Sequence, residues 1–186
     1  MMDPLALVLF VVLQLAFIWA RFAVFRVDGR KPAGVRVIEV STISAIAGGI
    51  LLMWRVTPAW PGLPVLATMA GSASGAVFAW ACATVRRRQL SGAFCDDLPV
   101  ELICEGPFRL VRNPFYAAYI AAHAMPLLAT GSMWGLMPLT WMTALYLRAA
   151  LLEERKFAHS RLAWDYGDYA RRTGRFLPRL AAWKRG

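Results

Sequence analysis

The stretch GPFRLVRNPFY at residues 106–116 leads into two apolar blocks, residues 115–130 and 133–152, which the paired acids Glu153 and Glu154 follow directly. Each block is close to the roughly 20 helical residues that cross the hydrocarbon core of a membrane. The pattern predicts a helical hairpin that returns the chain to the membrane face from which it started. We therefore expect the polar segments at its two ends to lie close together.

Three more apolar blocks of similar length precede this hairpin, at residues 5–20, 35–54 and 64–85. Hydrophobic residues make up 59% of the 186 residues, and the mean hydropathy is +0.48. This apolar share is above that of typical soluble domains. The five blocks together predict an all-α integral membrane protein with five transmembrane helices.

The basic residues are distributed unevenly between the predicted loops. Of the 21 Lys and Arg, five lie in or near the first loop, five in the third and ten from residue 148 onward, and only Arg55 lies in an even-numbered loop. By the positive-inside rule, the N-terminus is expected outside, and the third loop and the tail in the cytoplasm. We expect the membrane to be a bacterial inner membrane. The net charge of +10 then points to membrane lipids as partners and not to nucleic acid.

The chain is expected to form a single domain, residues 1–186. Within it we expect a three-helix scaffold at 1–85, a cytoplasmic loop at 86–114, the hairpin at 115–152 and a cytoplasmic segment at 153–186. Small residues at 71–75 and at 48–49 favour close approach of helices in lipid. The three cysteines and two histidines show no metal-ligand spacing, so no metal is predicted.

The third loop ends at a predicted helix start. Asn113 followed by Pro114 is typical of an N-cap and the first helical position, and such helix ends attract anions. Arg109 and Arg112 flank this position. They are candidates for binding a carboxylate, such as that of a methionine moiety, or for binding lipid phosphates.

Tyr116, Tyr119 and His123 recur at three- and four-residue spacing and therefore share one helix face. Polar side chains inside a membrane are costly unless they are paired or line a cavity. We expect His123 to be hydrogen-bonded to another helix, and general base is the alternative role.

These segments together resemble the isoprenylcysteine carboxyl methyltransferase family. The family pattern is G-P-[FY]-R-x-x-R-[HN]-P-x-Y-x-G, a transmembrane hairpin, E-E, Y-x-x-Y and then R-[FL]-[IL]-P. This chain supplies YGDY at residues 166–169 and RFLP at 175–178, so the resemblance covers residues 105–178. It departs from the pattern at Asn113, where many members have His, and at Ala118, where Gly is usual.

The resemblance implies a methyltransferase that uses S-adenosylmethionine, releases S-adenosylhomocysteine and acts on a lipophilic substrate in the membrane. The mixed aromatic and basic residues of the cytoplasmic tail predict an amphipathic helix over the cofactor, and the hairpin predicts that Arg112 and Glu153 lie close in space. The catalytic candidates are Glu153, Glu154 and Tyr116. The cofactor-binding candidates are Gly106, Arg109, Val111, Arg112, Asn113, Pro114, Tyr116, Tyr119, Glu153, Glu154 and Tyr169.

The acceptor stays open at this point. A carboxylate, as in isoprenylcysteine, needs no base, whereas an amine, as in phospholipid N-methylation, needs one when it arrives protonated. Membrane sterol reductases also resemble this C-terminal region, so a nicotinamide-dependent reductase is a further alternative, although the chain has no G-x-G-x-x-G. A non-catalytic membrane adaptor would explain the apolar blocks but not the paired polar segments.

Overall fold

The fold was analysed in a computed structural model, which describes residues 3–23, 25–26, 33–86, 90–91, 98–99 and 101–179. In chain order the elements are α1 (Pro4–Ala23), β1 (Phe25–Arg26), α2 (Ala33–Arg55), α3 (Leu63–Val85), β2 (Leu90–Ser91), η1 (Gly106–Arg109), α4 (Pro114–His123), α5 (Met125–Thr130), η2 (Met133–Gly135), α6 (Leu136–Ala158) and α7 (Ala163–Arg172). Apart from the two short strands, which pair in parallel, the architecture is helical.

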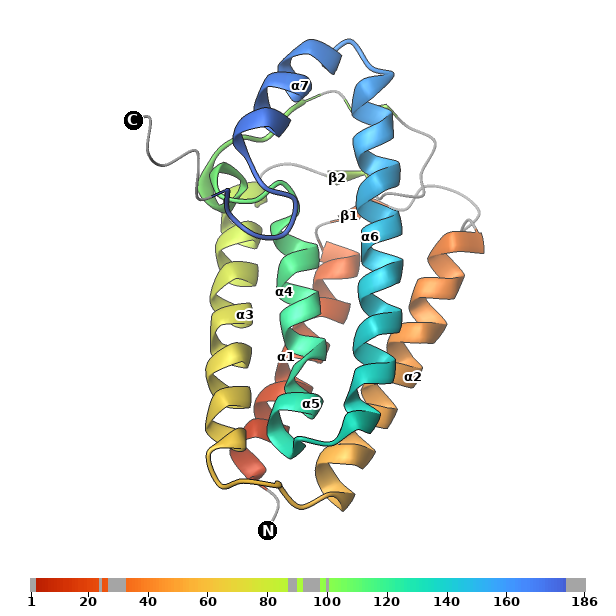
Figure 1. Cartoon of the computed structure of the whole chain (residues 1–186). Helices are drawn as coiled ribbons and strands as arrows, with labels where there is room; N and C mark the ends of the chain where they lie inside the picture. Colours follow the sequence, from red (N-terminus) through yellow and green to blue (C-terminus); the bar gives the residue numbers. More distant parts are fainter. Residues whose placement is uncertain are drawn as a thin grey trace.

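The long helices lie side by side along one bundle axis, and α7 covers the end at which α3 stops and α4 starts (Figure 1). Among the described residues, four segments are long and apolar enough to cross a membrane: Pro4–Arg21, Ala33–Arg55, Leu63–Val85 and Met133–Ala158. The prediction of helices long and apolar enough to span a membrane is confirmed for these four blocks. The fifth crossing and the orientation in the membrane stay predictions.

The predicted fourth span, residues 115–130, is divided between α4 and α5. Pro126 occupies the first turn of α5; it has no N–H to donate to the preceding turn, which favours a break in the helix. The two helices together cover residues 114–130, or about 26 Å at ~1.5 Å per residue. This length is slightly below the ~30 Å hydrocarbon core.

Glycines let the helices of the bundle approach closely. A methyl group on Gly71 of α3 would come within 2.7 Å of the Met125 side chain, and one on Gly75 within 3.1 Å of Leu13. A methyl group on Gly49 of α2 would come within 2.9 Å of Phe10 and of Pro126, whereas Gly48 faces open space. The predicted packing role is therefore confirmed for residues 71 and 75 and for Gly49, but not for Gly48.

Helix α6 extends beyond the predicted apolar block at 133–152. The first residues of the block form the short helix η2, and α6 runs from Leu136 to Ala158. Glu153 and Glu154 therefore lie within a helix, where successive residues point about 100° apart around the axis. As a result, the two adjacent carboxylates face different surroundings.

Candidate active site at the end of the helical hairpin

Backbone contacts join the third loop to the C-terminal segment. Val111 forms a parallel β-bridge with Gly174, and the backbone N–H of Arg112 donates to the carbonyl of Gly174 at 2.7 Å. On the adjoining helix α7, the hydroxyl of Tyr169 donates to the carbonyl of Phe108 at 2.7 Å. Because both segments lie at the same end of the hairpin, the predicted meeting of the two motif regions is confirmed.

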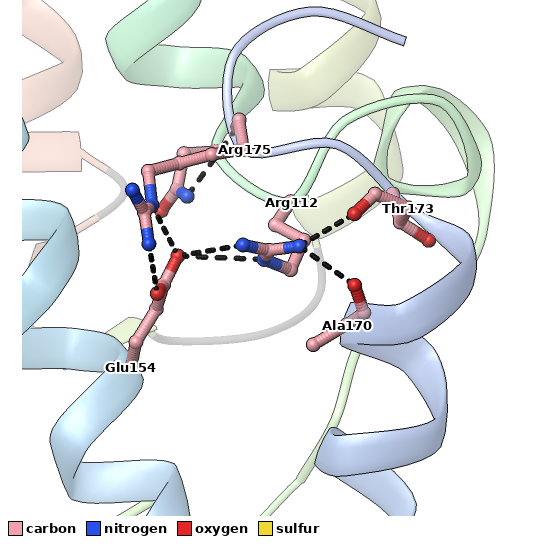
Figure 2. A network of polar contacts seen from close by, with 6 residues as sticks. Arg112, Glu154, Ala170, Thr173 and Arg175 are labelled. Atoms are coloured by element: carbon pink, nitrogen blue, oxygen red, sulfur yellow. Dashed lines mark hydrogen bonds and ion pairs between the residues drawn. The ribbon is translucent and has the colours of Figure 1, made fainter. Parts of the chain in front are cut away.

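A charged network fastens this junction to α6, as Figure 2 shows. The Arg112 guanidinium donates to Glu154 Oε1 from Nε at 3.3 Å and from NH2 at 3.1 Å. Arg175 donates to both oxygens of the same carboxylate at 2.8 Å each. The remaining Arg112 nitrogen donates to the backbone carbonyls of Ala170, at 3.0 Å, and Thr173.

Protein acceptors therefore use four of the five N–H groups of Arg112. Its side chain is only 9% exposed, and that of Glu154 is 17% exposed. The sequence paired Arg112 with Glu153, but the residue that contacts it is Glu154. This arrangement makes Arg112 and Glu154 a clamp that holds the end of α7 against the third loop.

Asn113 occupies the N-cap position of α4, but its side chain does not cap that helix. The predicted N-cap position and the proline start of α4 are confirmed. The side-chain capping bond is absent because the side chain bonds elsewhere: Nδ2 donates to the carbonyl of Arg175 at 3.4 Å, to which the backbone N–H of Asn113 also donates at 3.1 Å. A buried asparagine, 8% exposed, thus joins the loop to the C-terminal segment. A histidine N–H could donate similarly at this position.

Tyr116 and Glu153 form a second polar contact, closer to the centre of the bundle. The Tyr116 hydroxyl donates to Glu153 Oε1 at 2.7 Å, and both residues are partly buried. The Tyr116 ring stacks on that of Tyr146, with centroids 5.6 Å apart and planes 21° apart. Tyr119 contacts both rings, at 6.3 Å from Tyr116 and 5.5 Å from Tyr146. These three rings are the tyrosine cluster.

His123 lies one helical turn after Tyr119 in α4 and is buried. Its Nε2 is 3.3 Å from the hydroxyl of Tyr146 on α6, which confirms the expected hydrogen bond between helices. The prediction that Tyr116, Tyr119 and His123 share one helix face is also confirmed, since Tyr146 contacts all three rings.

Tyr166 of α7 borders the clamp and stacks on Phe157 of α6 at 4.6 Å. Burial, followed by the nearby Glu154 carboxylate, raises the pKa of Tyr166 to about 12, and the Arg112 and Arg175 guanidiniums oppose this shift. The phenol is therefore neutral at physiological pH. It contributes an uncharged aromatic wall between α6 and α7.

The predicted site residues thus fall into separate groups. Arg112, Asn113 and Glu154 belong to the clamp, and Tyr116, Tyr119 and Glu153 to the tyrosine cluster with its carboxylate. Gly106, with φ +58°, shapes the turn into η1, while Val111 and Tyr169 form structural contacts to the opposite segment, and Pro114 starts α4. Arg109 is exposed, and no hydrogen bond or ion pair to another described residue holds it.

Sequence reasoning missed three residues of this region: Tyr146, Thr173 and Arg175. Arg175 carried a signal, since it begins the RFLP segment, and Tyr146 carried a weaker one because it precedes Glu153 by seven residues, or two helical turns. Thr173 acts through its backbone carbonyl, and no pattern of side chains in the sequence predicts a hydrogen bond to that carbonyl. Its contribution is visible only in the folded chain.

Comparison with known proteins assigns the family. The sequence profile of the phospholipid methyltransferase family matches residues 67–162, which contain most of α3, the hairpin and both glutamates. No curated protein matches the chain, and no solved structure does. The matched region covers more than half of the chain and includes the Tyr116–Glu153 contact, so this integral membrane protein belongs to the phospholipid methyltransferase family.

Proposed function

We propose that this protein transfers a methyl group from S-adenosylmethionine to the amine of a phospholipid headgroup. The observation that carries the proposal is the hydrogen bond between Tyr116 and Glu153 at the end of the bundle. It places one carboxylate, oriented by a phenol, beside an apolar bundle that borders lipid. The family assignment supports methyl transfer, and this carboxylate favours an amine acceptor.

The chemistry of the tyrosine cluster fits the cofactor. S-adenosylmethionine carries a sulfonium cation, and aromatic faces together with a carboxylate attract cations. Tyr116, Tyr119 and Glu153 would hold that end of the cofactor, and the exposed Arg109 is the guanidinium available for its carboxylate. The clamp of Arg112, Glu154 and Arg175 would hold the C-terminal segment in place around it.

Glu153 has a defined task when the acceptor is an amine. A primary amine is protonated at neutral pH and has no lone pair to donate until it loses a proton. The Glu153 carboxylate can bind the ammonium group and accept this proton, while the Tyr116 hydroxyl keeps the carboxylate oriented. S-adenosylmethionine, when bound, would supply an electrophilic methyl group to the deprotonated nitrogen, with the electron pair of the carbon–sulfur bond left on S-adenosylhomocysteine.

The lipid tail contributes to positioning. An acceptor anchored in the bilayer reaches the end of the bundle without leaving the membrane, and its bound tail holds the nitrogen in place. A carboxylate acceptor, such as that of a prenylated cysteine, would place a second negative charge beside Glu153. Like charges at close range are unfavourable, so the same contact disfavours that acceptor.

The test is methyl transfer by the full-length protein in vesicles. Radiolabelled S-adenosylmethionine is offered with phosphatidylethanolamine, with prenylated cysteine and with tail-free analogues of each. We expect label on phosphatidylethanolamine and slower turnover on phosphoethanolamine. Label on prenylated cysteine alone would contradict the amine proposal, and calorimetric binding of NADPH instead of S-adenosylhomocysteine would contradict methyl transfer.

We also propose that this end of the bundle faces the cytoplasm, where S-adenosylmethionine is made. The uneven distribution of Lys and Arg supports this orientation. Reporter fusions after Pro61 and Gly131 should signal outside, and fusions after Gly92 and at Gly186 should signal the cytoplasm. A cytoplasmic signal at Gly131 would contradict the five-span arrangement.

A further inference from the structure

Helix α1 precedes the region that matches the family, yet it brings a cation to the tyrosine cluster. Arg21 lies in the last turn of α1, four residues after Phe17, so the two side chains share a helix face. The Phe17 ring packs on the Tyr119 ring, with centroids 4.6 Å apart. Arg21 therefore lies one helical turn beyond this contact, toward the end of the bundle that carries Glu153.

Two groups of opposite charge lie near Tyr119. Arg21 follows by one turn the Phe17 ring that packs on Tyr119, and the Tyr119 ring centroid is 6.3 Å from that of Tyr116. Glu153 is tied to Tyr116 through the 2.7 Å hydrogen bond. One guanidinium from α1 and one carboxylate from α6 thus lie near the same cluster of aromatic rings.

Within the described part of the chain, Arg21 is weakly held. Its NH2 is 4.0 Å from Glu39 Oε1 on α2, and the two side chains are 28% and 33% exposed. An ion pair at this distance with solvent access contributes little free energy. A guanidinium has five N–H donors in a planar fork that matches a phosphate group, so Arg21 can bind an anion from the membrane.

We propose that Arg21 binds the phosphodiester of the phospholipid whose amine is bound at Glu153. The inference rests on the proposed function and names its substrate as a zwitterionic glycerophospholipid. In an ethanolamine headgroup the anionic phosphodiester and the ammonium are joined by a short linker, so one molecule presents both charges. Arg21 and Glu153 present the complementary pair, with apolar helices beside them for the acyl chains.

This arrangement selects the acceptor by charge. A lipophilic amine without a phosphate would bind Glu153 but leave Arg21 without an anion. An N-acylated prenylcysteine, as at the end of a prenylated protein, would offer one carboxylate and no cation, and therefore nothing for Glu153. Specificity for the phospholipid then comes partly from α1, outside the region shared with the family.

The test compares two acceptors in reconstituted vesicles of the full-length protein. One is dioleoyl phosphatidylethanolamine, and the other is a primary amine carrying the same two chains without a phosphate. KM and kcat for methyl transfer are measured with wild-type protein, Arg21→Gln and Arg21→Lys. The control is Arg155→Gln, because Arg155 is an exposed arginine near the same end of α6 and lies about 200° around the helix from Glu153.

Arg21→Gln should raise KM for phosphatidylethanolamine about tenfold, a loss of ~1.4 kcal/mol, with kcat nearly unchanged. KM for the phosphate-free amine should stay at its wild-type value, and Arg21→Lys should recover part of the loss because it restores the charge without the planar fork. Arg155→Gln should match the wild type on both lipids. Unchanged affinity for S-adenosylhomocysteine in each variant verifies that the protein is folded.

Four results would overturn the inference. An unchanged KM of Arg21→Gln for phosphatidylethanolamine would make Arg21 an ordinary membrane anchor. An equal rise in KM for both lipids, or an equal effect of Arg155→Gln, would indicate a general effect on structure or surface charge. If wild-type protein methylates prenylated cysteine and neither amine, the proposed function fails and this inference fails with it.

Discussion

Glu153 and Glu154 are adjacent in the sequence, yet they occupy very different surroundings. Glu154 accepts hydrogen bonds from two guanidiniums, Arg112 and Arg175. Glu153 accepts one from a neutral phenol, that of Tyr116. The first carboxylate is neutralised and used in holding the chain together, whereas the second keeps an oxygen for a cationic ligand.

The difference shows how one short acidic motif can perform two tasks. Rotation of about 100° per residue turns Glu154 toward α7 and the third loop, and Glu153 toward α4. A carboxylate between two arginines is already satisfied and makes a poor base. We therefore assign proton transfer to Glu153 and the positioning of the C-terminal segment to Glu154.

The largest effect is expected from Glu153→Gln, which keeps the size of the side chain and removes its charge. Loss of the proton acceptor should reduce kcat for methylation of phosphatidylethanolamine by about 10²–10⁴. The melting temperature should change little, since Tyr116 can still donate to the amide oxygen. Asp165→Asn, an acid-to-amide change at an exposed position of α7, is the control; a comparable loss there, or full activity in Glu153→Gln, would contradict the assignment.

Glu154→Gln should lower the stability of the C-terminal segment more than it lowers the rate of methyl transfer. Without the carboxylate, Arg112 and Arg175 keep buried or partly buried charges with no counter-charge, which costs about 2 kcal/mol after allowance for solvent access. We expect faster amide hydrogen exchange in residues 163–178 and weaker binding of S-adenosylhomocysteine. If exchange there stays at its wild-type rate while kcat collapses, the roles of the two glutamates are reversed.

Arg175→Lys tests whether the clamp depends on geometry or only on charge. Arg175 donates to both oxygens of Glu154 at 2.8 Å, and an ammonium cannot reproduce this planar, two-oxygen contact. We expect a loss of about 1 kcal/mol, seen as intermediate hydrogen exchange between wild type and Glu154→Gln. Hydrogen exchange identical to that of wild type would show that the clamp needs only a positive charge at position 175 and not the two-oxygen contact.

Tyr116→Phe removes the hydroxyl that orients Glu153 and keeps the ring that stacks on Tyr146. One hydrogen bond contributes about 1 kcal/mol, so turnover should fall about fivefold. The loss should be far smaller than that in Glu153→Gln. Adding Tyr116→Phe to Glu153→Gln should cause a smaller further loss than Tyr116→Phe causes alone, because the two residues act together. Losses that multiply fully in the double variant would show that the two groups act independently.

The smallest effect is expected from Asn113→His, which introduces the residue that many isoprenylcysteine carboxyl methyltransferases carry at this position. Asn113 donates to the carbonyl of Arg175 at 3.4 Å, and a histidine N–H can do the same. Activity and hydrogen exchange should stay within about 0.5 kcal/mol of wild type. Asn113→Leu, whose side chain has no hydrogen-bond donor, is the comparison and should measurably increase hydrogen exchange in the C-terminal segment.

Much of this molecule could be predicted from its sequence. The apolar blocks gave the helices, because about 20 apolar residues bury their backbone polar groups only as a helix in lipid. The hairpin also required its two polar ends to meet, which the bridge between Val111 and Gly174 confirms. The shared face of Tyr116, Tyr119 and His123 followed from helical periodicity alone.

The tertiary structure decided which partner each polar group took. Adjacent residues such as Glu153 and Glu154 look alike in a sequence, and only the rotation of α6 and the position of α7 give one a phenol and the other two guanidiniums. The side-chain capping bond of Asn113 is absent for the same reason, since the carbonyl of Arg175 comes from a segment sixty-two positions away. Hydrophobic periodicity acts along the chain and is legible in the sequence, whereas hydrogen bonds between distant segments form only once packing has brought them together.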